Sequence, residues 1–212
     1  MSEQLTIFIP ASFAIGYMLG AVPFGVVLVY LATGQDIRTV GSGNIGATNV
    51  LRTGHKGLAL LTLVLDALKG AIAYFICSFW LSPDNAAYAG FGAVIGHCFP
   101  LWLRFKGGKG VATGMAVIAS ISPLAGLVMA ASWLLTAVIT RLSSLSALLS
   151  FLAAGLIASF GPVDMSVPVQ ITVWGIGGLS WIRHKENIQR IMTGDESRIS
   201  FKKIDPINQK LR

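Results

Sequence analysis

The chain has 212 residues, of which 54% are hydrophobic and only 12% are charged, and its mean hydropathy is +0.71. Soluble domains carry about 25% charged residues, so this composition excludes an ordinary soluble globular protein and indicates a membrane protein. The formal net charge is +7, which in a membrane protein reflects basic loops and attraction to anionic lipids. We therefore expect membrane lipids, and no nucleic acid, among its partners.

Apolar runs follow one another along the chain, several of them longer than the roughly 20 residues that cross hydrocarbon. They cover residues 5–33, 57–81, 86–103, 111–140, 144–160 and 167–182. We expect residues 5–33 to form one retained helix, because no basic stretch precedes it to mark a cleaved signal peptide. Ser122 and Pro123 predict a break in the fourth run, since proline lacks an N–H and clashes with the preceding turn. The sequence thus predicts an all-α, polytopic integral membrane bundle of about seven transmembrane helices.

Basic residues occupy alternate connections between these runs. They are Arg38, Arg52 and Lys56, then Arg104, Lys106 and Lys109, then Arg141, and finally eight residues beyond 182, whereas residues 1–4, 82–85, 121–123 and 161–166 contain none. Cytoplasmic loops collect Lys and Arg. Seven crossings put every basic loop on one face, with the N-terminus outside and the C-terminus cytoplasmic, whereas six would export the basic tail. We interpret residues 1–212 as a single transmembrane domain with a polar tail from about 184 to 212, which lies on the membrane surface or is partly disordered.

The first polar loop contains GSGNIG, residues 41–46, which matches the dinucleotide-binding pattern G-x-G-x-x-G. Asp66 even lies 20 residues after Gly46, where a ribose-binding acid is sought. That fingerprint requires a strand before it and a helix after it within a soluble βαβ unit. Here an apolar span precedes the motif and Asp66 lies inside the next one, so the dinucleotide interpretation is rejected.

Polar segments on the cytoplasmic face suggest a phosphate site instead. They are GSGNIGATNVLRTGHKG at 41–57, FKGGKGVAT at 105–113 and WIRHKENIQRI at 181–191. Glycine lets backbone N–H groups approach an anion, and a following helix N-terminus adds partial positive charge. Arg52 and Lys109 add full charges. Each segment alone is explained by positive-inside loops and turn residues. Because all three meet on one face, we favour a phosphate-binding site at the cytoplasmic interface.

GSGNIGATNVLR, GHCFPLWLRFKGGKGVAT and HKENI resemble the signature loops of the bacterial acyl-phosphate:glycerol-3-phosphate acyltransferases. The apolar runs between them occur in matching order, so the resemblance covers nearly the whole chain. It implies transfer of a fatty acyl group from acyl phosphate to the 1-hydroxyl of sn-glycerol 3-phosphate. The product is lysophosphatidic acid, the first intermediate of phospholipid synthesis. It also implies a multi-pass protein of the bacterial inner membrane, no cofactor, and other phospholipid-synthesis enzymes as candidate partners.

The resemblance also assigns roles by position in the three motifs. The residues implied to be catalytic are His184, Asn187, Lys109, Ser42 and Arg52. The residues implied to hold substrate are Asn44, Thr48, Asn49, Gly107, Gly108 and Gly110, with Ser144 and Ser146 from a further serine region. Which serine of 143–146 reaches the site stays open. Glu186 is implied to be structural.

The chemistry suits this reaction. One acyltransferase class uses H-x-x-x-x-D, in which aspartate orients a histidine base. Leu60, Trp102 and Gln189 stand where that aspartate would follow each histidine here, and no Ser-His-Asp set or G-x-S-x-G motif occurs. Acyl phosphate is already an activated anhydride, so the enzyme mainly needs orientation and oxyanion stabilisation. The donor's phosphate is available to accept the hydroxyl proton, while Asn187 or His184 donates to the oxyanion.

Other polar residues receive plainer interpretations. Asp66 and Lys69 lie three apart on a helix and can neutralise each other, so we expect site support or pairing inside the bundle. His97, Cys77 and Cys98 are interpreted as buried packing residues, and we expect no metal site.

Two rival functions remain. A transporter of phosphorylated metabolites would place its polar groups near the bilayer midplane and often shows internal repeats, whereas these polar groups gather in loops on one face. A scaffold subunit gives no reason for the glycine-rich loops.

Overall fold

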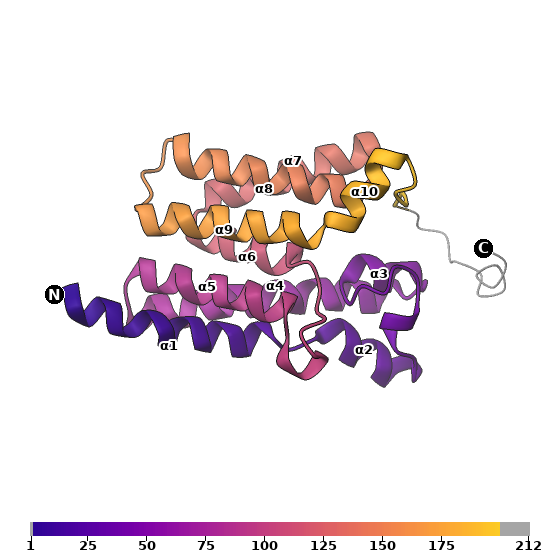
Figure 1. The fold of residues 1–212 in the computed structure, drawn as a ribbon, viewed down its shortest axis with the longest axis horizontal. Coiled ribbons are helices and arrows are strands. Elements are labelled where there is room, and N and C mark those ends of the chain that lie inside the picture. Colours follow the sequence, from indigo (N-terminus) through magenta and orange to yellow (C-terminus); the bar gives the residue numbers. More distant parts are fainter. Residues whose placement is uncertain (1, 200–212) are drawn as a thin grey trace.

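The computed structural model describes the backbone of residues 2–199 and the side chains of residues 8–199, and this part of the chain contains helices and no strand. The predicted all-α class is therefore confirmed for the described residues (Figure 1). The elements are α1 (Ser2–Gly20), α2 (Phe24–Thr33), η1 (Ile37–Thr39), α3 (Ala47–Arg52), α4 (Lys56–Trp80), α5 (Pro83–Cys98), η2 (Leu101–Leu103), α6 (Val111–Ile121), α7 (Pro123–Thr140), α8 (Ser143–Phe160), α9 (Val167–Arg183) and α10 (Lys185–Thr193). The expected tail is helical over α10, and its residues 200–212 lie outside the described part.

Five helical stretches are long and apolar enough to cross a membrane. They are Phe8–Thr33, Lys56–Trp80, Pro83–Leu103, Pro123–Thr140 and Ser143–Phe160. The helices α6, with 11 residues, and α9, with 17, are shorter but lie alongside the candidate spans in Figure 1. The described part of the protein is thus an all-helical bundle in which the axes of the long apolar helices lie roughly alongside one another (Figure 1).

The chain between residues 5 and 33 is not one helix, contrary to the sequence-based expectation. α1 ends at Gly20 and α2 begins at Phe24, with Pro23 immediately ahead of it. The missing N–H and the ring of proline break the ladder of helical hydrogen bonds at this point. The break frees the carbonyl oxygen of Val22, which accepts a hydrogen bond of 2.9 Å from the Lys69 ammonium of α4.

The break predicted at Ser122 and Pro123 is confirmed. Ser122 ends α6 and caps α7, where its hydroxyl oxygen accepts the N–H of Ala125 at 3.3 Å. Pro123 is the first residue of α7, a position where its missing N–H costs nothing. One serine–proline pair thereby reverses the chain and produces two antiparallel helices from one apolar run.

Helices α1 and α5 pack closely because glycines line their contact. A Cβ atom added at Gly16 or Gly20 would overlap the backbone of α5, and one added at Gly92 or Gly96 would overlap the backbone of α1. Small residues let helix backbones approach and gain van der Waals contact, which drives helix association where lipid surrounds the bundle.

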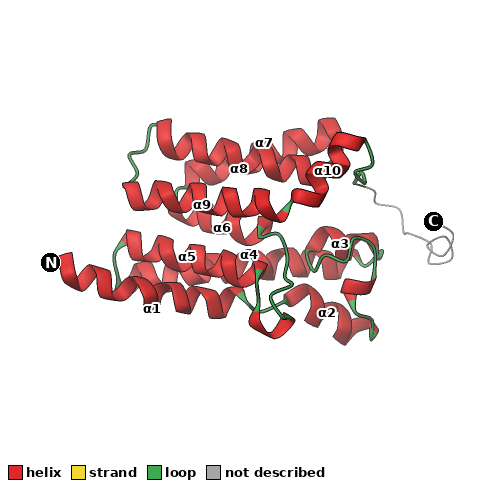
Figure 2. Cartoon of the chain, in the orientation of Figure 1, coloured by secondary structure: helices red, strands yellow, loops and turns green. Residues whose placement is uncertain are grey.

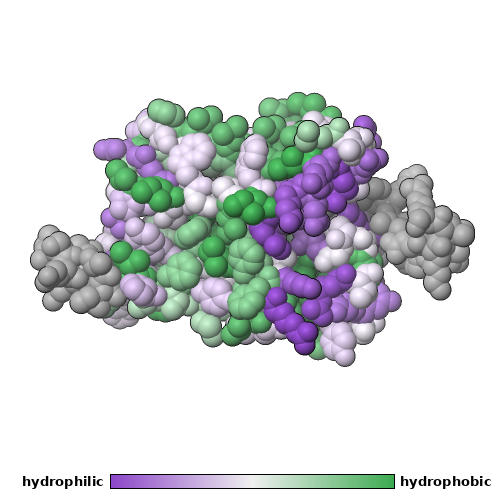
Figure 3. Space-filling view, in the orientation of Figure 1, coloured by the Kyte–Doolittle hydropathy of each residue, from purple (hydrophilic) through white to green (hydrophobic). Residues whose placement is uncertain are grey.

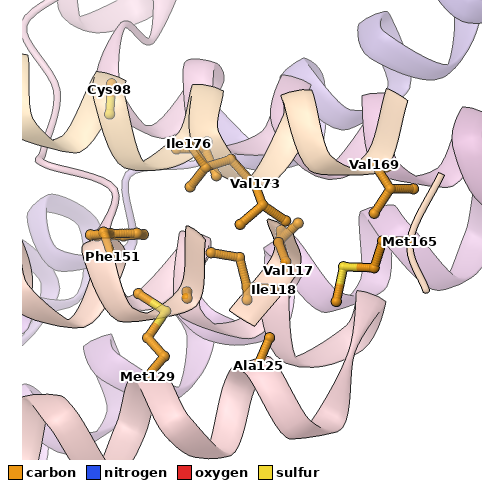
Figure 4. Packing of buried hydrophobic residues seen from close by; sticks show 14 residues of the cluster. Cys98, Val117, Ile118, Ala125, Met129, Phe151, Met165, Val169, Val173 and Ile176 are labelled. Carbon is orange, nitrogen blue, oxygen red and sulfur yellow. The ribbon is translucent and has the colours of Figure 1, made fainter. Parts of the chain in front are cut away.

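The main apolar core lies between α5, α6, α7, α8 and α9 (Figure 4). Its large, almost fully buried side chains include Ile118 of α6, Met129 of α7, Phe151 of α8 and Ile176 of α9. This packing fixes the ends of α6 and α9 relative to each other. The outward faces of α4 and α7 instead expose large apolar side chains, among them Leu61 and Phe75 of α4 and Leu134 and Val138 of α7. Such a surface suits contact with lipid.

The longer loops lie at one end of the bundle (Figure 2). At that end residues 34–46 connect α2 to α3, and residues 104–110 lead into α6. At the opposite end, residues 81–82 and Ser122 make short turns, and residues 161–166 connect α8 to α9. Most of the strongly hydrophilic surface in Figure 3 lies toward the loop-rich end, where Figure 1 shows α3 and α10.

Candidate functional site

A cavity of about 300 Å³ lies at the loop-rich end of the bundle. It brings together most of the residues that the sequence singles out, from segments far apart along the chain. The predicted residues that line it are Ser42, Asn44, Thr48, Asn49, Arg52, Asp66, Lys109, Gly110, Ser144, His184 and Asn187. Ser143, one of the serines of 143–146 among which the sequence left the choice open, also lines it. Lining residues that the sequence interpretation did not assign to a site include Leu63, His97, Met115, Trp133, Arg190, Glu196 and Ser197.

Asn49 organises the first polar loop. Its amide nitrogen donates to three backbone carbonyl oxygens, those of Ile37 at 3.2 Å, Val40 at 2.9 Å and Asn44 at 2.8 Å. Its amide oxygen accepts from the backbone N–H of Ser42 at 2.9 Å and from the Ser42 hydroxyl at 3.2 Å. The amide is therefore occupied by the loop itself, which makes Asn49 a scaffold for the neighbouring Ser42 and Asn44.

The glycines of this loop serve turns and close packing. Gly41 and Gly43 adopt left-handed backbone conformations with φ of +58° and +68°, which residues other than glycine rarely adopt. The helix that follows, α3, has six residues, and Asp66 lies well inside α4. Neither feature belongs to a dinucleotide-binding βαβ unit.

Arg52 and Thr48 extend from α3 toward two other segments. The Arg52 guanidinium donates to the Ser197 hydroxyl at 2.5 Å, and the Thr48 hydroxyl lies 3.5 Å from that of Ser143 at the start of α8. These contacts place a cation and a hydroxyl on the same side of the cavity, with the chain after α10 closing over them.

The glycine loop at residues 105–110 faces the cavity only with its last part. The Gly107 N–H donates to the Cys98 carbonyl at 3.1 Å, and the Gly108 N–H donates to the His97 carbonyl at 3.0 Å. Their own carbonyl oxygens accept from Arg183, at 2.9 Å for Gly107 and 3.1 Å for Gly108. The N–H groups expected to face an anion are thus bonded to α5, and neither glycine lines the cavity.

Free N–H groups are found one step further along the chain. Gly110 ends the loop with φ of +76° and is the N-cap of α6, and Val111 and Ala112 follow on the cavity wall. Within the described residues, the N–H groups of Val111 and Ala112 have no hydrogen-bond partner. The unpaired N–H groups of a first helical turn, with the partial positive charge of the helix end, suit an anion.

Lys109 supplies a full charge beside this helix end. Its ammonium donates to the amide oxygen of Asn187 across the cavity. Burial lowers the pKa of Lys109 to about 8, because an ammonium withdrawn from water is disfavoured. The side chain therefore stays mostly protonated at neutral pH and loses its charge in mildly alkaline solution.

His184 lies at the junction of α9 and α10, buried against the last turn of α9. Its Nδ1 is 2.7 Å from the carbonyl oxygen of Ser180, so Nδ1 carries the proton and donates. Burial lowers the pKa of His184 to about 4, which keeps the ring neutral at physiological pH. A neutral ring protonated on Nδ1 offers Nε2 as an acceptor, not as a donor.

Asn187 is held between a cation and an anion. Its amide oxygen accepts from Lys109, and its amide nitrogen donates to the Glu196 carboxylate at 2.6 Å. Glu196 also accepts from Ser144 at 2.7 Å and pairs with Arg190 at 2.8 Å. Burial alone would raise the pKa of Glu196, but these three hydrogen bonds outweigh it and lower the pKa, so the carboxylate is charged.

Of the two glutamates near Asn187 in the sequence, Glu196 lines the cavity and Glu186 does not. The Glu186 side chain is exposed, does not line the cavity, and has no hydrogen bond or ion pair with the described side chains. Gly194 ends α10 with φ of +81° and turns the chain back, so Glu196 reaches the cavity. Gly194 is a C-cap signal that the sequence shows, but the sequence does not reveal whether Asp195 or Glu196 turns inward.

The serine region divides in the same way. Ser143 and Ser144 line the cavity, whereas the Ser146 hydroxyl donates to the Leu142 carbonyl at 2.8 Å within α8 and lies away from the cavity.

Asp66 and Lys69 form the expected ion pair at 2.7 Å. The described residues contain no group of three or more His, Cys, Asp or Glu side chains placed to bind a metal ion, and Cys77 and Cys98 are buried free thiols.

The cavity wall changes character away from the loops. Leu63 of α4, Met115 of α6 and Trp133 of α7 line it together with Ala130. Leu63 is 46% exposed on the outer surface of the bundle, so this wall adjoins the lipid-facing surface. One cavity thereby combines cations and amides at the loop end with apolar groups between the helices.

Comparison with known proteins gives a consistent result. The family model described as "Glycerol-3-phosphate acyltransferase" matches residues 10–194. A glycerol-3-phosphate acyltransferase of Bradyrhizobium diazoefficiens is 48% identical over 199 residues, covering 93% of this chain and 98% of the relative. That of Agrobacterium fabrum is 49% identical over 189 residues, covering 89% and 90%.

Two solved structures are similar to this fold. The glycerol 3-phosphate form of PlsY (YgiH), an integral membrane glycerol 3-phosphate acyltransferase, superposes with a TM-score of 0.84 at 35% identity, covering 96% of this chain and 99% of that one. Its lysophosphatidic acid form gives a TM-score of 0.81 at 34% identity, covering 91% and 96%.

Proposed function

Because this chain belongs to the glycerol-3-phosphate acyltransferase family of integral, multi-pass membrane proteins, we propose that it acylates glycerol 3-phosphate. The acyl group comes from a fatty acyl phosphate and is transferred to the 1-hydroxyl of sn-glycerol 3-phosphate. The products are lysophosphatidic acid and inorganic phosphate.

The observation that carries this proposal is the composition of the cavity. Its loop end holds Arg52, Lys109 and the first turn of α6, which suit phosphate oxygens. Its other wall, with Met115 and Trp133, is apolar and adjoins the lipid-facing surface, which suits a fatty acyl chain. A site for both a water-soluble phosphate and a membrane lipid needs these two environments side by side.

The acyl-transfer step needs little from the protein beyond placement. The 1-hydroxyl oxygen attacks the acyl carbonyl carbon, the bond from that carbon to the phosphate oxygen breaks, and the phosphate leaves with the electron pair. The hydroxyl proton passes to an oxygen of the leaving phosphate. His184 orients the hydroxyl by accepting its hydrogen bond at Nε2, but with a pKa of about 4 it is a poor proton acceptor at neutral pH.

Asn187 is the proposed donor to the tetrahedral oxyanion. One of its two N–H bonds is directed to Glu196, and the amide is polarised by Lys109 on its oxygen. The second N–H is available for the oxygen that becomes negative during attack. A donor held in place before the reaction stabilises this charge without further reorganisation.

The proposal includes an orientation in the membrane. The helices α1, α4, α5, α6, α7, α8 and α9 form seven crossings, with the N-terminus outside and the cavity on the cytoplasmic side. The basic residues of the loop-rich end support this orientation, since Lys and Arg concentrate in the cytoplasmic loops of inner-membrane proteins.

Cysteine labelling tests this orientation. Asp164→Cys, exposed between α8 and α9, is expected to react with an impermeant reagent on intact cells, and Lys185→Cys only after lysis. Reaction of both from outside would contradict seven crossings.

The function itself is tested with purified protein in detergent, palmitoyl phosphate and glycerol 3-phosphate. Enzymatic acyl transfer predicts that lysophosphatidic acid forms without any sealed compartment. A transporter of phosphorylated metabolites would yield no product here and would move glycerol 3-phosphate into vesicles, which would refute the proposal.

A further inference from the structure

The proposed reaction leaves one buried polar cluster unused. Asp66 and Lys69 of α4 and His97 near the end of α5 are only 3%, 4% and 5% exposed. The Lys69 ammonium donates to Asp66 Oδ1 at 2.7 Å and to the Val22 carbonyl at 2.9 Å, and it lies 2.9 Å from His97 Nδ1. An ammonium has three N–H bonds, so these contacts account for all of them.

The Lys69 contact fixes the tautomer of His97. An ammonium has no lone pair and only donates, so Nδ1 of His97 must accept and the ring proton resides on Nε2. The Nε2 edge lies against the glycine loop, where a Cβ atom added at Gly108 would overlap it. The backbone of His97 supports the same residue, because its carbonyl accepts the Gly108 N–H at 3.0 Å.

The cluster contacts the chain on both sides of Lys109. Before it stands Gly108, held by His97 on one side and by Arg183 on the other, whose guanidinium also lies 5.1 Å from the centre of the Phe99 ring. After it comes the first turn of α6, where the Thr113 hydroxyl donates to the backbone carbonyl oxygen of Asp66 at 2.8 Å. Lys109 is therefore carried by a short segment that His97 contacts before it and the backbone of Asp66 contacts after it.

We propose that Asp66, Lys69 and His97 act as one positioning unit, which sets the place of Lys109 and of the α6 N-terminus in the cavity. Buried charges inside a membrane bundle are costly, and well-packed apolar residues hold helices together at least as firmly. The charged residues Asp66 and Lys69 add directional hydrogen bonding, because their hydrogen bonds allow only one orientation of the His97 ring. The inference rests on the proposed function, in which Lys109 meets substrate phosphate.

A double-mutant cycle separates positioning from a purely structural role. His97→Ala is expected to lower kcat/KM for glycerol 3-phosphate by about 10- to 100-fold, since a shift of about 1 Å in a placed group has such an effect. In a Lys109→Ala background the same change should cost less than about threefold, because the group being positioned is gone. Equal losses in both backgrounds would overturn the proposal.

Where Lys109→Ala turns over too slowly, the Kd of glycerol 3-phosphate from calorimetry supplies the same cycle. Lys106→Met, which removes an exposed cation of the same loop, is the matched control and should change neither constant. An inactive wild-type enzyme that also fails to bind glycerol 3-phosphate would count against the proposed function, not against the coupling within this unit.

A second variant guards against misfolding. Lys69→Met alone strands the Asp66 carboxylate in the bundle and is expected to unfold the protein, whereas Asp66→Asn combined with Lys69→Met removes both charges. The paired variant should keep the thermal transition of the wild type within a few degrees and still lose about tenfold in kcat/KM, a loss that disappears in the Lys109→Ala background. A folded paired variant with wild-type kcat/KM would overturn the proposal.

Discussion

The glycine loop of residues 105–110 and the α9–α10 junction meet across the same cavity, but different parts of the chain hold them in place. In the glycine loop the backbone makes the contacts: the N–H groups of Gly107 and Gly108 bond to α5, and their carbonyl oxygens accept from Arg183. At the junction the side chains make them, as Asn187 is held between Lys109 and Glu196. The glycine loop is thus held by hydrogen bonds at its backbone atoms, whereas the junction is held by hydrogen bonds between polar side chains.

This difference explains how each region contributes. A cation that meets phosphate throughout the reaction needs a fixed platform, and a loop bonded at four backbone atoms provides one. A donor to an oxyanion needs an N–H dipole directed at the oxygen that becomes negative in the transition state, and the polarised amide of Asn187 provides one. Changes in the loop should therefore act mainly through substrate binding, and changes at the junction mainly through the chemical step.

The largest effect is expected for Asn187→Ala. Removing a full oxyanion donor should lower kcat by about 10²–10³ with little change in KM, because the charge it meets exists only in the transition state. Steady-state kinetics in detergent or nanodiscs measures both constants. Gln189→Ala, an exposed amide on the same helix, is the control. An Asn187→Ala enzyme with unchanged kcat and raised KM would show that the junction, like the glycine loop, acts through substrate binding and not through the chemical step.

A smaller effect is expected for Gly108→Ala. The new methyl group would overlap the His97 ring and displace the loop, without removing any group that touches substrate. KM for glycerol 3-phosphate should rise about tenfold while kcat changes less, the pattern of lost uniform binding. Gly178→Ala in α9, where a Cβ atom meets nothing within 4 Å, is the matched control. A fall in kcat alone would show that the loop takes part in the chemical step.

The smallest effect is expected from pH. The pKa of Lys109 is lowered to about 8 by burial, so its charge is lost as the pH rises through that value. Above pH 7, where substrate phosphate is fully ionised, kcat/KM for glycerol 3-phosphate should fall through about pH 8, by up to about tenfold per unit. Lys109→Arg keeps the charge and should remove this fall. A profile with the same alkaline limb in both enzymes would assign it to another group.

The sequence was sufficient to predict the helical membrane class and many of the polar residues that line the cavity. Apolar runs and proline dictate helix existence locally, so the break at Pro123 followed from one residue. The break at Pro23 was missed, although Pro23 lies inside an apolar run just as Pro123 does and the same rule applies to both. The carbonyl oxygen of Val22 that this break frees accepts a hydrogen bond from Lys69 of α4, a contact that the sequence does not reveal.

The inner details of the site could not be predicted in the same way. Glycine in a loop predicts backbone freedom, but only the structure tells whether the N–H of Gly108 faces an anion or bonds to His97. Likewise Glu186 and Glu196 are both acids near Asn187 in sequence. Which one turns inward depends on the left-handed Gly194 and on the pairing with Ser144 and Arg190, which come together only in three dimensions.

The most direct test of the account compares two acyl donors on the wild-type enzyme. The proposed chemistry uses the donor's own phosphate as proton acceptor, since the neutral His184 is too weak a base at pH 7. Palmitoyl-CoA carries no phosphate on the attacked carbonyl carbon, so its kcat/KM should be lower than that of palmitoyl phosphate by about 10²–10⁴, the usual contribution of proton transfer. Comparable kcat/KM values for the two donors, measured as lysophosphatidic acid formed, would contradict substrate-assisted acyl transfer in this cavity.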